Sequence, residues 1–172
     1  GVKHPRYLMG GVVAGIRDYG NRVGIPTVAG QVAFHPAYTG NPLVNVGCIG
    51  IMPKSDLIHS RAGGAGDIYI LAGGRTGRDG IHGASGLASR TFEEKVELRP
   101  TVQVGNPFLE KVLIEACLEA LDTGLVNAIQ DLGAAGLTSA AIESAASGGR
   151  GIRLDIAEVH QREEGMSAYE VM

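Results

Sequence analysis

The sequence is poor in residues that several common functions need. It has no Trp, three Phe and five Tyr, and its 15 Lys and Arg residues are spread along the chain against 18 Asp and Glu residues. Nucleic-acid binding relies on clustered positive charge and on aromatic side chains that stack on bases, so this composition disfavours that function. The two cysteines, Cys48 and Cys117, lack metal-ligand spacing, which favours buried reduced thiols over a disulfide.

Long apolar runs are missing as well. No run approaches the ~18 residues of a membrane helix, and no signal peptide opens the chain, so we expect a cytoplasmic protein. Hydrophobic residues make up 44% and charged residues 19%, which is typical of globular chains rather than of disorder. The chain begins without Met, and 167–172 has the pattern of a continuing helix, so we expect a segment of a larger protein.

Glycine, by contrast, is abundant, with 27 residues that cluster at turns. The central stretch is 126–149, VNAIQDLGAAGLTSAAIESAASGG, which predicts a strand, a glycine-rich turn and a helix capped by Thr138 or Ser139. Asp131 would stand at the carboxyl end of that strand, beside a helix N-terminus, where α/β proteins bind anionic ligands. Asp131 is therefore a candidate Mg²⁺ ligand, and the alternative is that it only caps a turn.

A second glycine-rich stretch, 73–84, follows the predicted strand 68–71. Backbone N–H groups in such a loop can surround a phosphate, with Arg78 adding charge, or the loop can be a plain tight connection. It lacks the Lys-Ser/Thr pair of a Walker A loop and does not open a Rossmann helix. Asp79 and His82 are candidate acid–base or metal groups, although nothing in the spacing shows that they converge.

Two further helices are predicted by apolar stripes, over 8–24 and after Asn106. Asn106 is a good N-cap, Pro107 a good first residue, and Gly124 a stop signal. Gln103, just before the cap, either offers its amide to a ligand at this helix N-terminus or is polar filler.

The order of elements predicts a mixed α/β fold in two parts. Residues 1–54 would end one subdomain, 55–66 would be a flexible glycine-rich linker, and 67–172 would form a second, incomplete subdomain. Apolar or alternating patterns predict strands at 27–34, 43–52, 68–71, 101–105, 126–129 and 152–156.

Several stretches together resemble one family. They are VVAGIRDYGNRVGIPTVAG (12–30), GRTGRDGIHGA (74–84), QVGNPFLEK (103–111), IQDLGAAGLTSA (129–140) and QREEGM (161–166). The order and spacing are similar to those of the synthetase subunit of phosphoribosylformylglycinamidine synthase, in its small multi-subunit form. The resemblance covers nearly all 172 residues.

This resemblance implies an ATP-dependent carbon–nitrogen ligase of de novo purine biosynthesis, with an aminoimidazole-ribonucleotide-synthetase-like fold. The family converts formylglycinamide ribonucleotide to formylglycinamidine ribonucleotide with ATP, Mg²⁺ and glutamine-derived ammonia. The implied partners are a glutaminase subunit and a small third subunit. We expect no nucleic-acid or membrane partner, and we expect self-association of the segment, because the 43–52 strand alone would expose apolar surface and an unpaired edge.

The resemblance also implies roles for single residues. The QVG motif carries a substrate-binding glutamine, Gln103, and the IQD motif carries a magnesium-binding aspartate, Asp131. The phosphate-side candidates in the glycine-rich loop are Gly77, Arg78, Asp79 and Gly80. No catalytic residue falls in this chain, since the family's catalytic histidines would precede Gly1 and its Glu-Ser-Gln motif would follow Met172.

Two positions depart from the family pattern, and two rival functions stay open. Gln31 stands where relatives often have Glu, and Asn106 where they often have Asp; Asn106 still suits a helix cap. One rival is another superfamily enzyme, such as aminoimidazole ribonucleotide synthetase or a related kinase. The other is a non-catalytic scaffold that docks the glutaminase subunit, which the presence of Gln103 and Asp131 disfavours.

Overall fold

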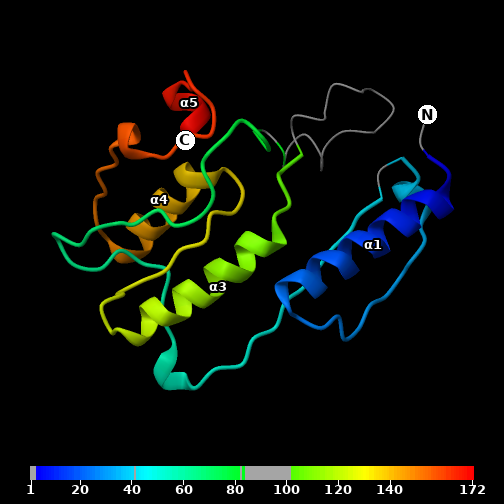
Figure 1. The fold of residues 1–172 in the computed structure, drawn as a ribbon, viewed down its shortest axis with the longest axis horizontal. Coiled ribbons are helices and arrows are strands. Elements are labelled where there is room, and N and C mark those ends of the chain that lie inside the picture. The colour runs from blue at the N-terminus through cyan, green and yellow to red at the C-terminus, as the bar shows by residue number, and fades with distance from the viewer. Residues whose placement is uncertain (1–2, 41, 82, 84–101) are drawn as a thin grey trace.

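The computed structural model describes residues 3–40, 42–81, 83 and 102–172. Its α-helices lie in a row, with α1 at one end, α3 in the middle, and α4 and α5 at the other end (Figure 1). None of the described helices is long and apolar enough to cross a membrane. The helical elements are α1 (Pro5–Val23), η1 (Pro36–Tyr38), η2 (Lys54–Asp56), α3 (Pro107–Asp122), α4 (Gly136–Gly148), η5 (Ile156–Glu158) and α5 (Ala168–Val171).

The predicted first helix is confirmed as α1, which begins three residues earlier than expected. The ring of His4 accepts a hydrogen bond from the backbone N–H of Arg6 at 3.2 Å, and Pro5 occupies the first helical position. Gly24 ends the helix with φ of 85°, a left-handed conformation that glycine adopts without steric cost.

The helix predicted after Asn106 is confirmed as α3. The Asn106 side chain accepts a hydrogen bond from the backbone N–H of Leu109 at 3.1 Å, so the predicted N-cap is present. α3 packs against α1, and the Tyr19 hydroxyl at the end of α1 donates to Glu110 in the first turn of α3. This contact raises the pKa of Tyr19, because the hydrogen bond to the Glu110 carboxylate stabilises the protonated phenol.

The helix in the central stretch is confirmed as α4, but its predicted caps are wrong. The helix begins at Gly136 after Ala135, which has φ of 61° and makes no capping hydrogen bond. Thr138 lies inside the first turn, where its N–H and its hydroxyl donate to the Met172 carbonyl at 3.2 and 2.8 Å. The start of α4 is therefore covered by a segment 34 residues away along the chain.

The predicted strands are not paired in the described part of the chain. Segments 27–34, 43–52, 68–71, 102–105, 126–129 and 152–155 are not assigned as strands; residue 101 lies outside the described residues. A strand exists only where a neighbour supplies hydrogen-bond partners about 4.8 Å away, and these segments have no such neighbour within the described chain. Among the described residues, pairing is limited to one isolated parallel bridge between Thr76 and Gln161.

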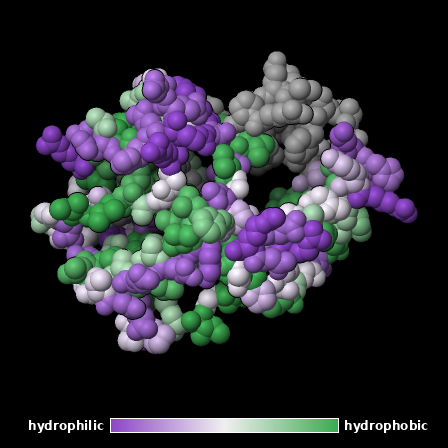
Figure 2. All heavy atoms as spheres, in the orientation of Figure 1, coloured by the Kyte–Doolittle hydropathy of each residue, from purple (hydrophilic) through white to green (hydrophobic). Residues whose placement is uncertain are grey.

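The chain by itself buries little apolar surface. Its accessible area is 13826 Å², whereas a compact protein of this size exposes about 8,000 Å². Figure 2 shows hydrophobic side chains open to solvent among hydrophilic ones. The buried side chains belong mainly to α4 and α5 and are Val23, Ala140, Ala141, Ser144, Ala145 and Val171. The small core therefore lies at the α4–α5 end of the molecule.

The glycine-rich segment before residue 67, expected to be flexible, is tied to α4. The N–H of Ala62 donates to the Ser144 carbonyl at 2.9 Å, and Arg150 donates to the Gly63 carbonyl at 3.2 Å. Gly148 allows this approach, because a Cβ there would lie 2.5 Å from the Ala62 carbonyl oxygen. The predicted surface segment 87–98 lies outside the described residues.

Candidate functional site

The glycine-rich loop lies beside the polar segment 160–165 near the chain's end. The N–H of Thr76 donates to the His160 carbonyl at 2.9 Å, and the N–H of Arg162 donates to the Thr76 carbonyl at 2.8 Å. These two bonds form the parallel bridge between Thr76 and Gln161. Two motif stretches that are 85 residues apart, at Arg78 and Glu163, are thereby brought together.

Arg78 is the centre of this contact. Its Nε donates to Glu170 at 2.6 Å, and one terminal nitrogen donates to Glu163 at 2.6 Å. The other terminal nitrogen lies 3.5 Å from both the Gly165 carbonyl and Glu170, and the backbone N–H donates to Glu163 at 3.2 Å. The guanidinium is therefore engaged on every nitrogen.

The electrostatics of this cluster favour the charged forms. The Arg78 side chain, together with the N–H and hydroxyl of Ser167, lowers the pKa of Glu170 to about 2. Hydrogen bonds from the side chain and the backbone of Arg78 also lower the pKa of Glu163, and the two carboxylates raise the pKa of Arg78. All three groups are ionised at neutral pH.

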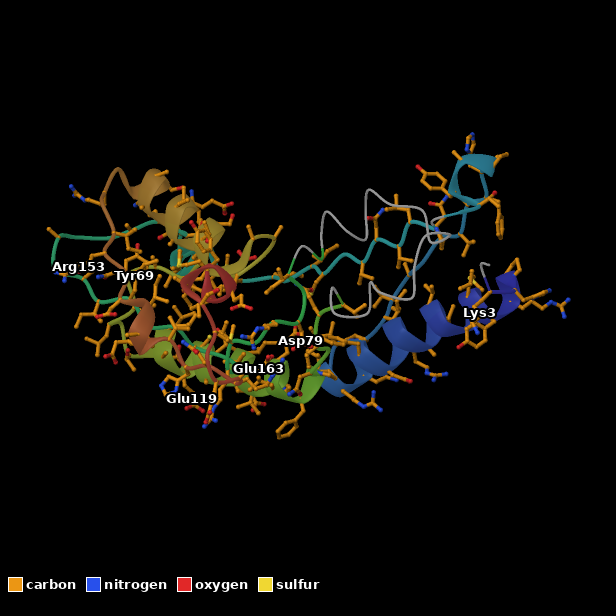
Figure 3. All side chains as sticks on the ribbon, turned by 90° about the horizontal axis from the view of Figure 1, so that it is seen from above. Lys3, Tyr69, Asp79, Glu119, Arg153 and Glu163 are labelled. Carbon is orange, nitrogen blue, oxygen red and sulfur yellow. The ribbon has the colours of Figure 1, made fainter. Side chains whose placement is uncertain are left out.

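A second arginine extends the cluster to Asp79. Arg162 forms an ion pair with Asp79 and lies 3.5 Å from Glu163. Figure 3 places Asp79 and Glu163 near one another in the middle of the molecule. Gly77 leaves room for this arrangement, because a Cβ at this position would lie 2.7 Å from the Arg162 guanidinium carbon and would displace that side chain.

Gln103 rests directly on the glycine-rich loop. A Cβ at Gly80 would lie 2.7 Å from Gln103 Cγ, and Gly80 has φ of 84°, so both space and backbone conformation demand glycine. Gln103 is exposed, and its amide makes no hydrogen bond to any residue that the structure describes. The structure therefore brings Gln103 together with the loop, on an exposed part of the described chain.

Asp131 stands apart from that cluster, in the turn before α4. Gln130 donates its side-chain amide to the backbone carbonyl and to one carboxylate oxygen of Asp131, both at 3.2 Å. The other carboxylate oxygen faces Gly133, where a Cβ would lie 3.5 Å away. Asp131 is exposed, and its side chain accepts from Gln130 and shares no hydrogen bond with Gln103 within the described residues.

An exposed carboxylate of this kind fits one position in a Mg²⁺ coordination shell. Mg²⁺ is usually held by one or two carboxylates together with phosphates and water. Within the described ranges, no group of three His, Cys, Asp or Glu side chains converges as a metal site. Asp131 therefore offers one carboxylate to such a shell, without a second or third acidic or His side chain grouped with it among the described residues.

The remaining candidates divide as follows. Asp79, predicted as an acid–base or metal group, is paired with Arg162. Gln31 is exposed on an unpaired extended segment, and His82 lies outside the described residues.

Sequence reasoning missed the acidic partners of Arg78. One local signal was present, since Ser167 and Glu170 form a capping box at the start of α5, the S-x-x-E pattern. That pattern places the Glu170 carboxylate near the backbone of Ser167. The partnership with Arg78, 92 residues away, has no local sequence signal.

Comparisons with known proteins identify relatives of the whole chain. Residues 64–172 match the family described as AIR synthase related protein, C-terminal domain, and residues 2–52 match the corresponding N-terminal domain. Phosphoribosylformylglycinamidine synthase subunit PurL of Thermomicrobium roseum is 60% identical over 99% of this chain, and that of Granulibacter bethesdensis is 56% identical over 98%. The chain spans about a quarter of the length of these relatives, 23% and 24%.

Solved structures of related proteins resemble this chain over nearly its whole length. Thermotoga maritima PurL complexed with FGAR matches 94% of this chain and 27% of its own chain, with a TM-score of 0.85 and 44% identity. The same protein complexed with ATP matches 94% and 24%, with a TM-score of 0.78 and 40% identity. The structure of PurLQS from Thermotoga maritima matches 92% and 24%, with a TM-score of 0.77 and 40% identity. The expected aminoimidazole-ribonucleotide-synthetase-like fold is confirmed.

Proposed function

Because the chain belongs to the family of AIR synthase related proteins, we propose that it is a segment of a synthetase subunit that amidates formylglycinamide ribonucleotide. The reaction consumes ATP and glutamine-derived ammonia. ATP activates the formyl-amide oxygen by phosphoryl transfer, and ammonia then displaces it. The observation that carries this proposal is the match to a PurL complexed with FGAR, at a TM-score of 0.85 over 94% of this chain.

Gln103 is the substrate-binding residue in this proposal. Its amide is exposed beside the glycine-rich loop, and an amide can both donate to and accept from a polar substrate. Gly80 of the loop lies against the aliphatic part of the Gln103 side chain, so this contact does not involve the amide.

Asp131 is the Mg²⁺ ligand in this proposal. Its carboxylate is exposed beyond Gln130, in the turn that precedes α4. Mg²⁺ bound to ATP neutralises the negative charge of the phosphates during phosphoryl transfer. The PurL structure complexed with ATP supports nucleotide as the companion of this ion.

The four phosphate-side candidates do not carry equal support. Arg78 and Asp79 are engaged in ion pairs with side chains of the same chain. We therefore assign contact with phosphate to the backbone N–H groups of Gly77 and Gly80 rather than to the Arg78 guanidinium.

The domain division and the partners are parts of the same proposal. Residues 1–54 belong to one synthetase subdomain, 55–66 connect, and 67–172 belong to the next. The parent subunit receives ammonia from a glutaminase subunit and assembles with a small third subunit, for which the multi-subunit PurLQS structure is the model. Its catalytic residues lie in other segments of the subunit.

Calorimetric titration of the complete subunit with formylglycinamide ribonucleotide, in the presence of Mg-nucleotide, tests the site. Gln103→Ala and Asp131→Asn should both weaken binding, by about tenfold each, and Asp131→Asn should also blunt the dependence on Mg²⁺. Asn21→Ala and Asp122→Asn are matched controls, because both side chains are exposed on the helices α1 and α3. Binding unchanged in both site variants would remove the site assignment. A subunit that binds aminoimidazole-type substrates instead would favour the other superfamily activity, and one that binds only the glutaminase would favour a scaffold.

A further inference from the structure

We propose that Arg78 is a positioning residue for the substrate-binding amide of Gln103, acting through the glycine-rich loop. This inference deepens the proposed function and rests on it. Arg78 itself touches no substrate in this account. It holds the loop against the segment that ends in α5, and the loop in turn forms the surface on which Gln103 lies.

The first step is the anchoring of the loop. Arg78 bonds to Glu163 and Glu170 at 2.6 Å each, and its backbone N–H also bonds to Glu163. Charge-assisted hydrogen bonds from a planar guanidinium fix direction as well as distance. The side chains of Arg78, Glu163 and Glu170 are only about a third exposed, at 38%, 37% and 31%, so solvent competes less for them than for a surface pair.

The second step connects the anchor to Gln103. Gly80 is two residues beyond Arg78 and touches Gln103 closely enough that even one added methyl group would clash. A shift of the loop by a fraction of an ångström therefore moves the support of the Gln103 side chain. Among the described residues, Gly80 is the one whose added Cβ would meet the Gln103 side chain, so the position of the loop bears on how that side chain is oriented.

The contacts that hold the 76–80 loop are ionic rather than apolar. The 76–80 loop is rich in glycine and has few side chains to pack, so dispersion contacts cannot fix it. Two arginines and three carboxylates supply directional contacts instead, from residues Arg78, Arg162, Asp79, Glu163 and Glu170. Gly77 lets the Arg162 guanidinium approach the loop backbone.

The test is a double-mutant cycle on the complete subunit. Arg78→Met should raise KM for formylglycinamide ribonucleotide by about tenfold, and KM for ATP is followed in parallel. In a Gln103→Ala background, Arg78→Met should change the substrate KM by less than about twofold, because the group it positions is gone. Arg78→Lys should recover part of the loss, since an ammonium can still pair with one carboxylate.

Controls separate positioning from general destabilisation. Arg17→Met removes an arginine whose ion pair with Asp18 lies on the exposed face of α1, and it should leave both KM values unchanged. Gly80→Ala should reproduce the Arg78→Met effect by displacing Gln103 directly. Gly66→Ala imposes similar backbone strain, at φ of 99°, with no atom within 4 Å of the new Cβ, and should not reproduce it.

Hydrogen exchange followed by mass spectrometry gives a readout that needs no substrate. Arg78→Met should speed exchange in 76–81 and also in 102–105, and Glu163→Gln should do the same to a smaller degree. Faster exchange in 76–81 alone would overturn the link to Gln103, and so would KM effects of Arg78→Met and Gln103→Ala that multiply independently. A wild-type subunit that does not bind formylglycinamide ribonucleotide would overturn the proposed function itself, whatever the exchange data show.

Discussion

Two regions of this molecule, each built from short extended pieces, reach very different states. The segment 27–53 runs past α1 with nearly every side chain exposed, including Phe34 at 93% and Ile51 at 99%. The segments 76–80 and 160–170 are held together by a backbone bridge and by ion pairs. The difference is that the second pair of segments finds its partners within the chain, whereas the first has no paired strand among the described residues.

The two regions also differ in their chemistry, because the first is rich in apolar side chains and the second in charged and polar ones. The exposed segment carries valine, isoleucine and phenylalanine, which gain stability only when water is excluded from them. The anchored loop uses directional polar contacts that persist at a partly exposed site. An isolated chain therefore keeps the second arrangement and leaves the first unsatisfied.

The largest expected effect concerns the exposed segment. We expect the 172-residue chain to self-associate at micromolar concentration, because unpaired extended segments present apolar side chains and free backbone groups. A double change, Ile49→Lys with Ile51→Lys, should lower the molecular mass in a light-scattering dilution series by severalfold. Tyr169→Lys, at a residue 97% exposed near α5, should not. A strict monomer at all concentrations would contradict the comparison.

A smaller effect is expected where the ordered region is tightest. Gly148→Ala places a Cβ 2.5 Å from the Ala62 carbonyl oxygen, so the linker backbone must move. We expect a loss of about 1–3 kcal/mol in the free energy of unfolding, measured by urea denaturation of the complete subunit. Gly151→Ala is the control, because nothing lies within 4 Å of its Cβ. Equal stability of the two variants would mean that the linker is not held against α4.

The N-cap of α3 allows one local contact to be tested on its own. Asn106→Ala removes the side-chain oxygen that accepts from the Leu109 N–H and should cost about 1 kcal/mol. Hydrogen exchange at the first turn of α3 measures the loss directly. Asn106→Asp keeps an acceptor and should behave as the wild type, and a rise in exchange for Asp as large as for Ala would show that the cap contributes nothing.

The smallest effect is a pH dependence of the ionic cluster. The pKa of Glu170 is lowered from 4.5 to about 2 in the folded chain, so its stabilising contribution is present above about pH 4.5 and is lost as pH falls towards 2. Glu170→Gln should therefore be less stable than wild type at pH 6, with the difference shrinking between pH 4.5 and 2. Urea midpoints at a series of pH values measure it. Glu164→Gln, at an exposed neighbour, should show no such trend.

Several features that depend on residues close in sequence could be predicted from the sequence. Asn106 and Pro107 predicted the start of α3, and Gly124 predicted its end, because capping depends on residues adjacent in sequence. Gln103 was predicted either to offer its amide to a ligand beside a helix start or to be polar filler; it is exposed there, and its role stays a prediction. The motifs also predicted the family, which the comparisons confirm.

Contacts between segments far apart in the chain could not be predicted from the sequence. Thr138 was predicted to cap α4 and instead donates to the Met172 carbonyl, and Arg78 was predicted to face phosphate and instead pairs with Glu163 and Glu170. The strand predictions were wrong for the isolated chain, since the period of a pattern says which face is apolar but not whether a partner strand is present.

Sequence alone determined that α1 and α3 are helices, the N-cap of α3, and the family. These depend on interactions within a few residues or on motif order. Tertiary structure decided which distant charges pair, that Gly80 supports Gln103, and that the linker is held on α4. These depend on where the chain folds back in space, and for the extended segment 27–53 that decision needs partner strands, which the described residues do not supply.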